Sequence, residues 1–180
     1  VYGGTQDFGS WKGPSTKKGR FPIRFEDWEH VNGGDGFYNL VDPNDSRWLY
    51  SSSQFGHITR IDQKTGSRKT IVDDRNDDLR FNWNTPLLIS PHNSKTLYVG
   101  AQLILRSVNQ GESWENISPD LAGFDIDKKG FGPFIYGTLT TLDESPIKEG
   151  VIWTGSDNGN VYITQDGGKI WTKLNSNIIG

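Results

Sequence analysis

Two acidic residues next to glycines or a tight turn are candidates for catalysis: Asp7 in "TQDFG" and Asp35 in "GGDGF". Hydrolysis of a glycosidic bond by paired carboxylates requires an acid and a base or nucleophile, with the two carboxyl groups roughly 5 to 9.5 Å apart. Aspartate beside glycine is also a frequent turn pattern, because the short carboxylate accepts hydrogen bonds from nearby backbone amides. Both interpretations stay open, since the sequence does not show that the two carboxylates face each other.

Further polar and aromatic residues lie between predicted strands and are candidates for binding a hydroxyl-rich ligand such as a glycan. They are Gln6, Gln54, Arg80, Asn82, Trp83, Asn84, Gln102, Tyr136, Asp157 and Asn158. Two of them have structural alternatives. Trp83 could stack on a sugar or pack as a wedge between sheets, and Arg80 could bind an anion or pair with a neighbouring carboxylate.

No metal site or cofactor is expected from the residue types. Cysteine is absent, and His30, His57 and His92 are scattered without the spacing of metal ligands. The segment "DDRNDD" is interpreted as a solvated loop. Calcium binding by its aspartates, Asp73, Asp74, Asp77 and Asp78, is the alternative.

Composition indicates which elements position these residues. Only 33% of the 180 residues are hydrophobic, but seven Trp, six Tyr and nine Phe supply bulk, while 22 Gly and eight Pro imply many turns. We therefore expect an all-β protein. The net charge of -3, with both signs interspersed, does not favour nucleic acid as a partner. The chain also contains no apolar run of the roughly 18 residues that a membrane span requires, and its first residues lack a signal-peptide pattern.

A repeat with a period of roughly 50 residues, typical of solenoids and propellers, runs through the chain. Pro43, Pro91 and Pro146 mark two successive intervals of the repeat, and the aromatic positions Tyr50, Tyr98 and Trp153 are separated by the same two intervals. We call the separation of Pro43 and Pro91 the first repeat interval. Tyr2 lies one such interval before Tyr50, so an earlier copy of the repeat unit begins the chain without its first strand. The chain thus holds about three and a half units.

Each unit is predicted to form four short antiparallel strands, A to D. In the second complete unit these are "TPLLIS", "TLYVGA", "LILRSV" and "SWENIS". Sheets of this size that recur at this period predict the blades of a β-propeller, whereas a β-sandwich would not explain the period. We expect about three and a half blades of a larger propeller, as one partial domain over 1–180 with blade pieces at about 1–27, 28–80, 81–130 and 131–180.

Two units carry the pattern Ser/Thr-x-Asp/Asn-x-Gly-x-x-Trp between strands C and D. The copies are "SVNQGESW", with Ser107, Asn109, Gly111 and Trp114, and "TQDGGKIW", with Thr164, Asp166, Gly168 and Trp171. The Asp or Asn side chain can accept turn amides, Gly permits positive φ, and Trp fills the space between sheets. We therefore interpret these residues as structural. The corresponding "TRIDQKTG" has Asp62 and Gly66 but no Trp.

These turns resemble the Asp-box, or BNR, repeats of sialidase-type, sortilin-type and xyloglucanase-type β-propellers. Segments such as "GGDGFYNLVDP" and "RFNWNTPLLISPH" extend the resemblance to large secreted bacterial glycosyl-hydrolase-like and sortilin-like propeller proteins. The resemblance implies a longer parent with further blades and a secreted, periplasmic or cell-envelope location. It does not settle whether such a propeller is an enzyme.

Up-and-down connectivity places the D–A and B–C loops at one end of the blades and the A–B and C–D turns at the other. The resemblance implies that ligands bind on the D–A and B–C face, to which all the candidate ligand residues map. We expect a glycan-binding or protein-binding segment there, and part of a glycoside hydrolase is the alternative. Sialidase activity is not favoured, because "FPIR" reverses the Arg-Ile-Pro order typical of that family.

Overall fold

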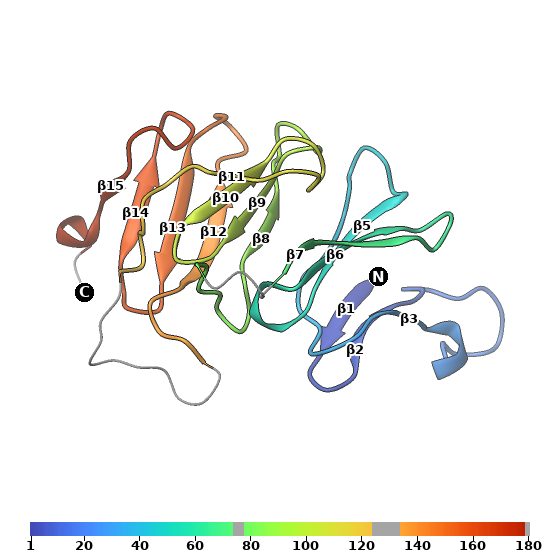
Figure 1. Cartoon of the computed structure of the whole chain (residues 1–180). Helices are drawn as coiled ribbons and strands as arrows, with labels where there is room; N and C mark the ends of the chain where they lie inside the picture. The colour runs from blue at the N-terminus through green and yellow to red at the C-terminus, as the bar shows by residue number, and fades with distance from the viewer. Residues whose placement is uncertain (74–77, 124–133, 179–180) are drawn as a thin grey trace.

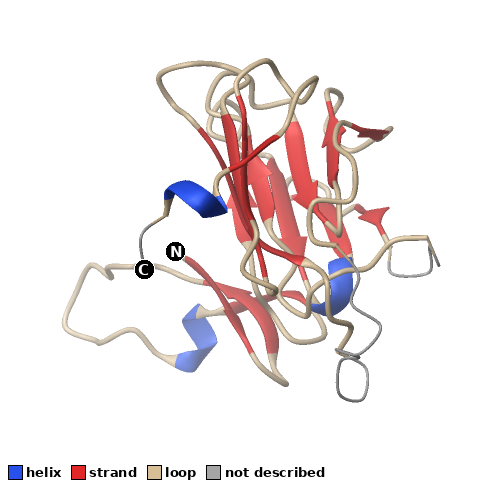
Figure 2. Cartoon of the chain, turned by 90° about the vertical axis from the view of Figure 1, so that its left-hand side faces the viewer, coloured by secondary structure: helices blue, strands red, loops and turns tan. Residues whose placement is uncertain are grey.

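The computed structural model describes residues 1–73, 78–123 and 134–178 as four antiparallel sheets, which follow one another along the chain (Figure 1). Within this part, helix is limited to three short 3₁₀ segments at Phe25–Asp27, Gln54–Gly56 and Asn175–Asn177 (Figure 2). The all-β expectation is therefore confirmed. No helix among the described residues is long and apolar enough to cross a membrane.

Each sheet is built from strands that are consecutive in the chain. The first contains β1 (Tyr2–Thr5), β2 (Gly9–Lys12) and β3 (Glu29–Asn32). The second contains β4 (Asn39–Val41), β5 (Trp48–Ser52), β6 (Ile58–Asp62) and β7 (Arg68–Val72). The third contains β8 (Leu87–Ile89), β9 (Leu97–Gly100), β10 (Ile104–Ser107) and β11 (Glu115–Asn116). The fourth contains β12 (Leu139–Glu144), β13 (Ile152–Ser156), β14 (Val161–Thr164) and β15 (Thr172–Lys173).

The strand count of the first sheet matches the incomplete first unit of the repeat. Its strands β1, β2 and β3 correspond to B, C and D, and no strand A of the described chain pairs with β1. This sheet continues past the expected boundary at 27, because β3 pairs with β2 through Trp11 opposite His30 and Lys12 opposite Glu29. The expected boundary was too early because the long segment between β2 and β3 separates strand D from the other strands in the sequence.

The hydrophobic cores lie between successive sheets. Between the second and third sheets, Tyr50, Ile58 and Ile71 form a buried cluster with Val72, Phe81, Leu87, Leu97, Val99 and Ala101. A second cluster, between the third and fourth sheets, contains Tyr98, Ile104, Leu121, Ala122, Leu139 and Ile152. The cluster between the first two sheets is smaller and consists of Val31, Leu49 and Ile61. Each sheet is thus stabilised mainly by its neighbours.

The turns at 107–114 and 164–171 have the same hydrogen-bond pattern. In the first, Ser107 Oγ donates to Asn109 Oδ1 (2.9 Å), and the Gly111 N–H donates to Ser107 Oγ (2.9 Å). In the second, Thr164 Oγ1 donates to Asp166 Oδ1 (2.8 Å), and the Gly168 N–H donates to Thr164 Oγ1 (3.0 Å). Asn109 Oδ1 also accepts the Ser113 N–H, and Asp166 Oδ1 accepts the N–H groups of Lys169 and Ile170, so these side chains hold the backbone of each turn.

Each of these turns also attaches its sheet to the preceding one. The indole Nε1–H of Trp114 donates to the carbonyl of Ile71 (2.8 Å), and that of Trp171 donates to the carbonyl of Ile117 (2.9 Å). Gly111 has a φ of 83°, and a Cβ there would lie 2.6 Å from the Ile71 side chain. The close approach therefore requires glycine.

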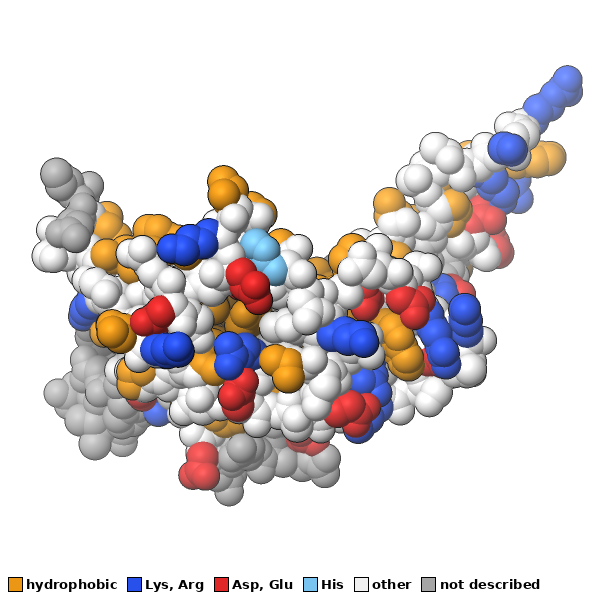
Figure 3. All heavy atoms as spheres, turned by 90° about the horizontal axis from the view of Figure 1, so that it is seen from above, with side chains coloured by type: hydrophobic (Ala, Val, Ile, Leu, Met, Phe, Trp, Pro, Cys, Tyr) orange, Lys and Arg blue, Asp and Glu red, His pale blue; other side chains and the backbone are white. Residues whose placement is uncertain are grey.

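These turns lie at the end of the molecule that carries the A–B connections. In Figure 1 the 164–171 turn is at the upper end of the fourth sheet, and Figure 3 looks onto this end. Acidic and basic side chains are mixed across it rather than gathered by sign (Figure 3). The described side chains of this surface therefore form no single-sign patch of the kind that attracts a polyanion.

Two aspartates in the C–D turns make stability depend on pH. The hydrogen bond from the Ile170 N–H, with that from Thr164, holds the pKa of Asp166 below its ordinary value. The hydrogen bond from Arg47 lowers the pKa of Asp62 more strongly. Because each pKa is lower in the folded chain, the stabilisation is complete above the unfolded value of about 3.9. This stabilisation is lost as the pH falls through the pKa values of the two aspartates in the folded chain.

We therefore expect the urea midpoint of unfolding to fall between about pH 4 and pH 2. Asp166→Asn copies the natural Asn109 of the third sheet, so it should keep the turn at neutral pH while reducing the decline in acid. The check is urea unfolding of both proteins across this pH range. An unchanged acid decline in the variant would contradict the assignment to Asp166.

Candidate functional site

The D–A and B–C loops meet at the end of the sheets opposite the 107–114 and 164–171 turns. The B–C loops contain residues 6–8, 53–57, 101–103 and 157–160, and the D–A connections contain 33–38, 73–86 and 117–138. In Figure 1 the loop that follows β13 lies at the lower end of the fourth sheet. We call this end, with the described residues of these loops, the loop face.

Three B–C loop side chains bind the D–A segment that enters their own sheet. Gln54 Oε1 accepts the N–H of Asp35 (2.8 Å), and Gln102 Oε1 accepts the N–H of Arg80 (2.8 Å). In the fourth sheet the Asp157 carboxylate accepts the N–H groups of Gly137 and Thr138, both at 3.1 Å. These three side chains hold equivalent positions in their sheets, and we call them the loop ties. Their oxygens accept hydrogen bonds from the protein's own backbone.

The spacing of the loop ties in the sequence is itself a signal of their shared role. Gln54, Gln102 and Asp157 are separated by the same two intervals as the repeated prolines and aromatic residues. These side chains recur at the same spacing as core positions, so each unit has one at the equivalent place. A residue repeated in this way is expected to have a structural role. Gln6 lies one first repeat interval before Gln54. Its side chain is exposed and makes no hydrogen bond within the described chain.

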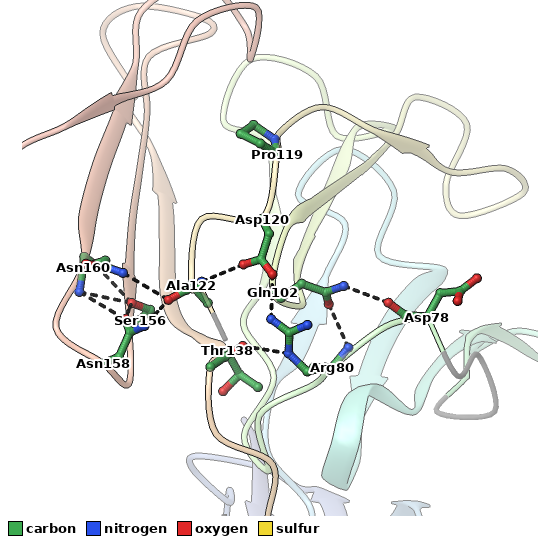
Figure 4. A network of polar contacts seen from close by, with 12 residues as sticks. Asp78, Arg80, Gln102, Pro119, Asp120, Ala122, Thr138, Ser156, Asn158 and Asn160 are labelled. Carbon is green, nitrogen blue, oxygen red and sulfur yellow. Dashed lines mark hydrogen bonds and ion pairs between the residues drawn. The ribbon is translucent and has the colours of Figure 1, made fainter. Parts of the chain in front are cut away.

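Arg80 pairs with a carboxylate, as the structural alternative proposed. Its guanidinium Nη2 lies 2.7 Å from Asp120 Oδ2, and its Nε donates to the Gly137 carbonyl (3.3 Å) (Figure 4). Gln102 also donates from Nε2 to the Asp78 carbonyl (2.8 Å), so both ends of its amide are bonded. Arg80 thus fastens two successive D–A segments together.

The neighbouring candidates also brace loops. Asn82 donates from Nδ2 to Thr138 Oγ1 (3.0 Å), and Tyr136 donates from its hydroxyl to the Asp157 carbonyl (3.3 Å). Asn158 donates to the carbonyl of Ala122 on the adjacent connection (Figure 4). By contrast, Asn84 is exposed, and its side chain makes no hydrogen bond in the described part of the chain.

The two candidate catalytic aspartates lie in adjacent loops. The backbone N–H of Asp7 donates to Asp35 Oδ1 (2.7 Å), so part of the Asp35 carboxylate is used to join the first and second sheets. Asp7 has a φ of 67° and an exposed side chain. Its carboxylate has no partner among the described residues. The structure therefore brings the two residues together but gives them different surroundings.

Four aromatic rings form a continuous cluster across the loop face. Phe37 contacts Trp83 edge-on with ring centroids 5.1 Å apart, and Trp83 contacts Phe134 at 5.9 Å. Phe55 contacts Phe134 at 5.9 Å, and its N–H donates to the Trp83 carbonyl (3.2 Å). Trp83 is therefore both a wedge between loops and the centre of a partly exposed aromatic cluster. Phe134 is 45% exposed, and the other three rings are half-buried.

Phe37, Phe55 and Phe134 were not among the predicted site residues. All three are aromatic residues in the same loops as predicted candidates, which is the signal that could have found them. Phe55 also adopts a left-handed backbone with a φ of 57°. This conformation costs roughly 1 to 2 kcal/mol for a residue other than glycine, and a single sequence does not reveal it.

A shallow hollow adjoins the aromatic cluster. It has a volume of about 290 Å³ and is lined by Gly4, Gly36, Phe37, Tyr38 and Asn84. Ligand clefts commonly begin at about 300 Å³, so the hollow is of a size for one small ring rather than a large ligand. Backbone and amide groups line it beside the Phe37 ring.

The described residues contain no group of three His, Asp or Glu side chains arranged to hold a metal ion. Asp74 and Asp77, which were considered for calcium, lie outside the described residues.

Comparison with known structures adds the overall architecture. The GH74 enzyme of Niastella koreensis matches 96% of this chain and 27% of its own, with 15% sequence identity and a TM-score of 0.57. The chain folds as β-propeller blades. The chain spans well under half the length of each of the three structures described here. Its four sheets form part of a propeller. No family model and no curated protein sequence matches the chain.

Two structures of the propeller protein YCF48 are also similar. YCF48 from Cyanidioschyzon merolae matches 77% of this chain and 39% of its own, with 17% identity and a TM-score of 0.49. YCF48 bound to a D1 peptide matches 72% of this chain and 37% of its own, with 19% identity and a TM-score of 0.45.

Proposed function

We propose that this propeller segment binds a polysaccharide across the loop face. The observation that carries the proposal is the cluster of Phe37, Trp83, Phe134 and Phe55, which spans three successive D–A connections. Aromatic rings offer flat apolar faces that suit the C–H faces of sugar rings, and nearby polar groups can bind sugar hydroxyls.

The unbonded polar side chains of the loop face support this function. Gln6, Asp7 and Asn84 have no protein partner within the described chain, unlike the loop ties. Ile135, beside Phe134, is 48% exposed and extends the apolar surface. The resemblance in fold to a GH74 enzyme is compatible with a polysaccharide ligand.

Binding of soluble β-glucan and xyloglucan oligosaccharides, measured by titration calorimetry, tests the proposal. Phe134→Ala should weaken binding about tenfold, or about 1.4 kcal/mol, because it removes one aromatic face of the binding surface. Phe21→Ala is the matched control, since Phe21 is 68% exposed but lies outside the cluster. Equal affinities for the two variants, or no binding of any glycan, would contradict the proposal, and the latter result would favour a protein partner.

Glycoside hydrolysis is a second candidate, favoured by the hydrogen bond that brings Asp7 and Asp35 together. In this function the free Asp7 carboxylate is the group available to exchange a proton with substrate. Asp7→Asn should then abolish the release of reducing ends from a β-glucan while leaving its binding unchanged. Release that is equal in Asp7→Asn and the wild type would exclude Asp7 as the catalytic carboxylate.

The proposal also covers the type of the repeated turns and the location of the protein. We assign the 107–114 and 164–171 turns to Asp-boxes on the basis of their shared hydrogen bonds. The location that fits a polysaccharide ligand is secreted, periplasmic or in the cell envelope, with further blades of a longer parent chain completing the propeller.

A further inference from the structure

Several glycines of the chain directly follow an asparagine or an aspartate. The pairs are Asn32-Gly33, Asp35-Gly36, Asn158-Gly159 and Asp166-Gly167. In such a pair the backbone nitrogen of the glycine can attack the side-chain carbonyl carbon of the preceding residue, because glycine has no Cβ to hinder the approach. The attack requires a glycine N–H that is not held in a hydrogen bond, so the bonding of each N–H decides which pair can react.

In all but the first of these pairs the glycine N–H donates to a backbone carbonyl at 3.0 Å. The acceptors are Thr5 for Gly36, Ser156 for Gly159, and Gly150 for Gly167. These nitrogens are fixed by the turns to which they belong, so the structure protects these pairs.

The side chain of Asn158 is fixed as well. Its Nδ2 donates to the carbonyl of Ala122, and its Oδ1 accepts a hydrogen bond from Ser156 Oγ (Figure 4). An amide bonded at both ends cannot turn toward the nitrogen of Gly159 without losing these contacts. Asn158-Gly159 is therefore a protected pair with the same two residues as Asn32-Gly33.

The pair Asn32-Gly33 has neither restraint. The N–H of Gly33 has no acceptor among the described residues. The Asn32 amide makes one long hydrogen bond, from Nδ2 to the Ser51 carbonyl (3.4 Å). Gly33 is exposed, and a Cβ there would meet nothing within 4 Å, so the surrounding space is open.

We propose that Asn32 is a site of spontaneous deamidation. The backbone nitrogen of Gly33 forms a bond to Asn32 Cγ, the bond from Cγ to Nδ2 breaks, and ammonia leaves with the proton of the Gly33 N–H. A water molecule then opens the succinimide ring at either of its carbonyls. The product at position 32 is aspartate or isoaspartate, and the reaction needs no oxidant or cofactor.

The modification changes the connection between the first and second sheets. Position 32 directly precedes the segment that holds Asp35, whose N–H donates to Gln54 Oε1 (2.8 Å) and whose carboxylate accepts the Asp7 N–H (2.7 Å). Isoaspartate lengthens the backbone by one carbon before this segment, and both products replace the amide donor to Ser51 by a carboxylate. We therefore expect the Asp7 and Asp35 contacts to loosen in the modified chain.

Peptide mapping by mass spectrometry of the full chain, incubated at about pH 8.5, tests the site. The rate should be higher than at about pH 6, because the attacking nitrogen must lose its proton. Deamidation at Asn32 should exceed that at Asn158 several-fold in the folded chain. In urea the two rates should become similar, since only the fold distinguishes the two pairs.

Gly33→Ala is the matched variant. Its added methyl group hinders the attack and should slow deamidation at Asn32 several-fold. The fold tolerates this methyl group, because the Cβ has room and the φ of Gly33 lies outside the left-handed region. Equal rates at Asn32 and Asn158 in the folded chain, a difference that persists in urea, or an unchanged rate in Gly33→Ala would overturn the proposal.

Hydrogen exchange tests the consequence for the loop. The amides of Asp7 and Asp35 should exchange faster in the isoaspartate form, separated by chromatography, than in the unmodified chain. Asn32→Asp, which gains the charge without the longer backbone, should show a smaller effect. Unchanged exchange in the isoaspartate form would show that the modification does not loosen the contact between the first two sheets.

Discussion

Replacing Trp114 by alanine is expected to lower the free energy of unfolding by about 3 kcal/mol. The indole packs against the buried cluster between the second and third sheets, and its Nε1–H donates to the Ile71 carbonyl (2.8 Å). Tryptophan-to-alanine changes in cores cost about 3 to 5 kcal/mol, and Trp114 is only partly buried, so we expect the lower end of this range. Urea unfolding of the two proteins is the measurement.

Two controls separate packing from the hydrogen bond. Trp114→Phe keeps most of the ring but loses the donor, and should cost about 1 kcal/mol. Trp153→Ala removes a ring of the fourth sheet that is 46% exposed, and should change stability far less. If Trp114→Ala proved no more harmful than Trp153→Ala, the turn would not attach the sheets as the structure indicates.

Replacing Glu144 by alanine is expected to lower the free energy of unfolding by about as much as Trp114→Ala does. This carboxylate is 2% exposed at the end of β12. Ser90 Oγ donates to one of its oxygens (2.5 Å), while the Gly150 N–H (2.9 Å) and the Tyr98 hydroxyl (3.4 Å) donate to the other. Removing it leaves buried donors unpaired, at about 1 to 3 kcal/mol for each. We therefore expect a loss of about 3 kcal/mol in urea unfolding.

Glu144→Gln is the matched variant, because it keeps the shape and one acceptor oxygen. It should lose about half as much stability as Glu144→Ala. Wild-type stability in Glu144→Ala, or an equal loss in both variants, would show that the buried acceptor does not join the third and fourth sheets.

The repeat explains why the fold could be predicted from the sequence. Prolines and aromatic residues that recur at the same two intervals reflect local strand and turn chemistry, and these positions stay in register in every sheet. The missing first strand was visible in the same way, from the interval that leads back to Tyr2. The end of the first sheet was not, since β3 pairs with β2 across a long intervening segment.

The candidate site was less predictable, because a polar side chain in a loop looks the same whether it binds ligand or backbone. Gln102 and Asp157 hold loops through contacts that depend on the path of the chain. The same holds for Arg80, whose partner Asp120 lies on the next D–A connection. The aromatic cluster likewise depends on Phe55 adopting a left-handed backbone beside Trp83.

Indole N–H signals in ¹H–¹⁵N spectra offer the most direct test of the proposed polysaccharide-binding face. Trp83 lies at the centre of the aromatic cluster, and its Nε1–H has no acceptor among the described residues. Trp114 and Trp171 lie at the opposite end, with their Nε1–H groups bonded to backbone carbonyls. Titration with a soluble β-glucan oligosaccharide should shift the Trp83 signal and leave those of Trp114 and Trp171 unchanged. An unshifted Trp83 signal at saturation, or shifts confined to Trp114 and Trp171, would contradict the assignment of the loop face.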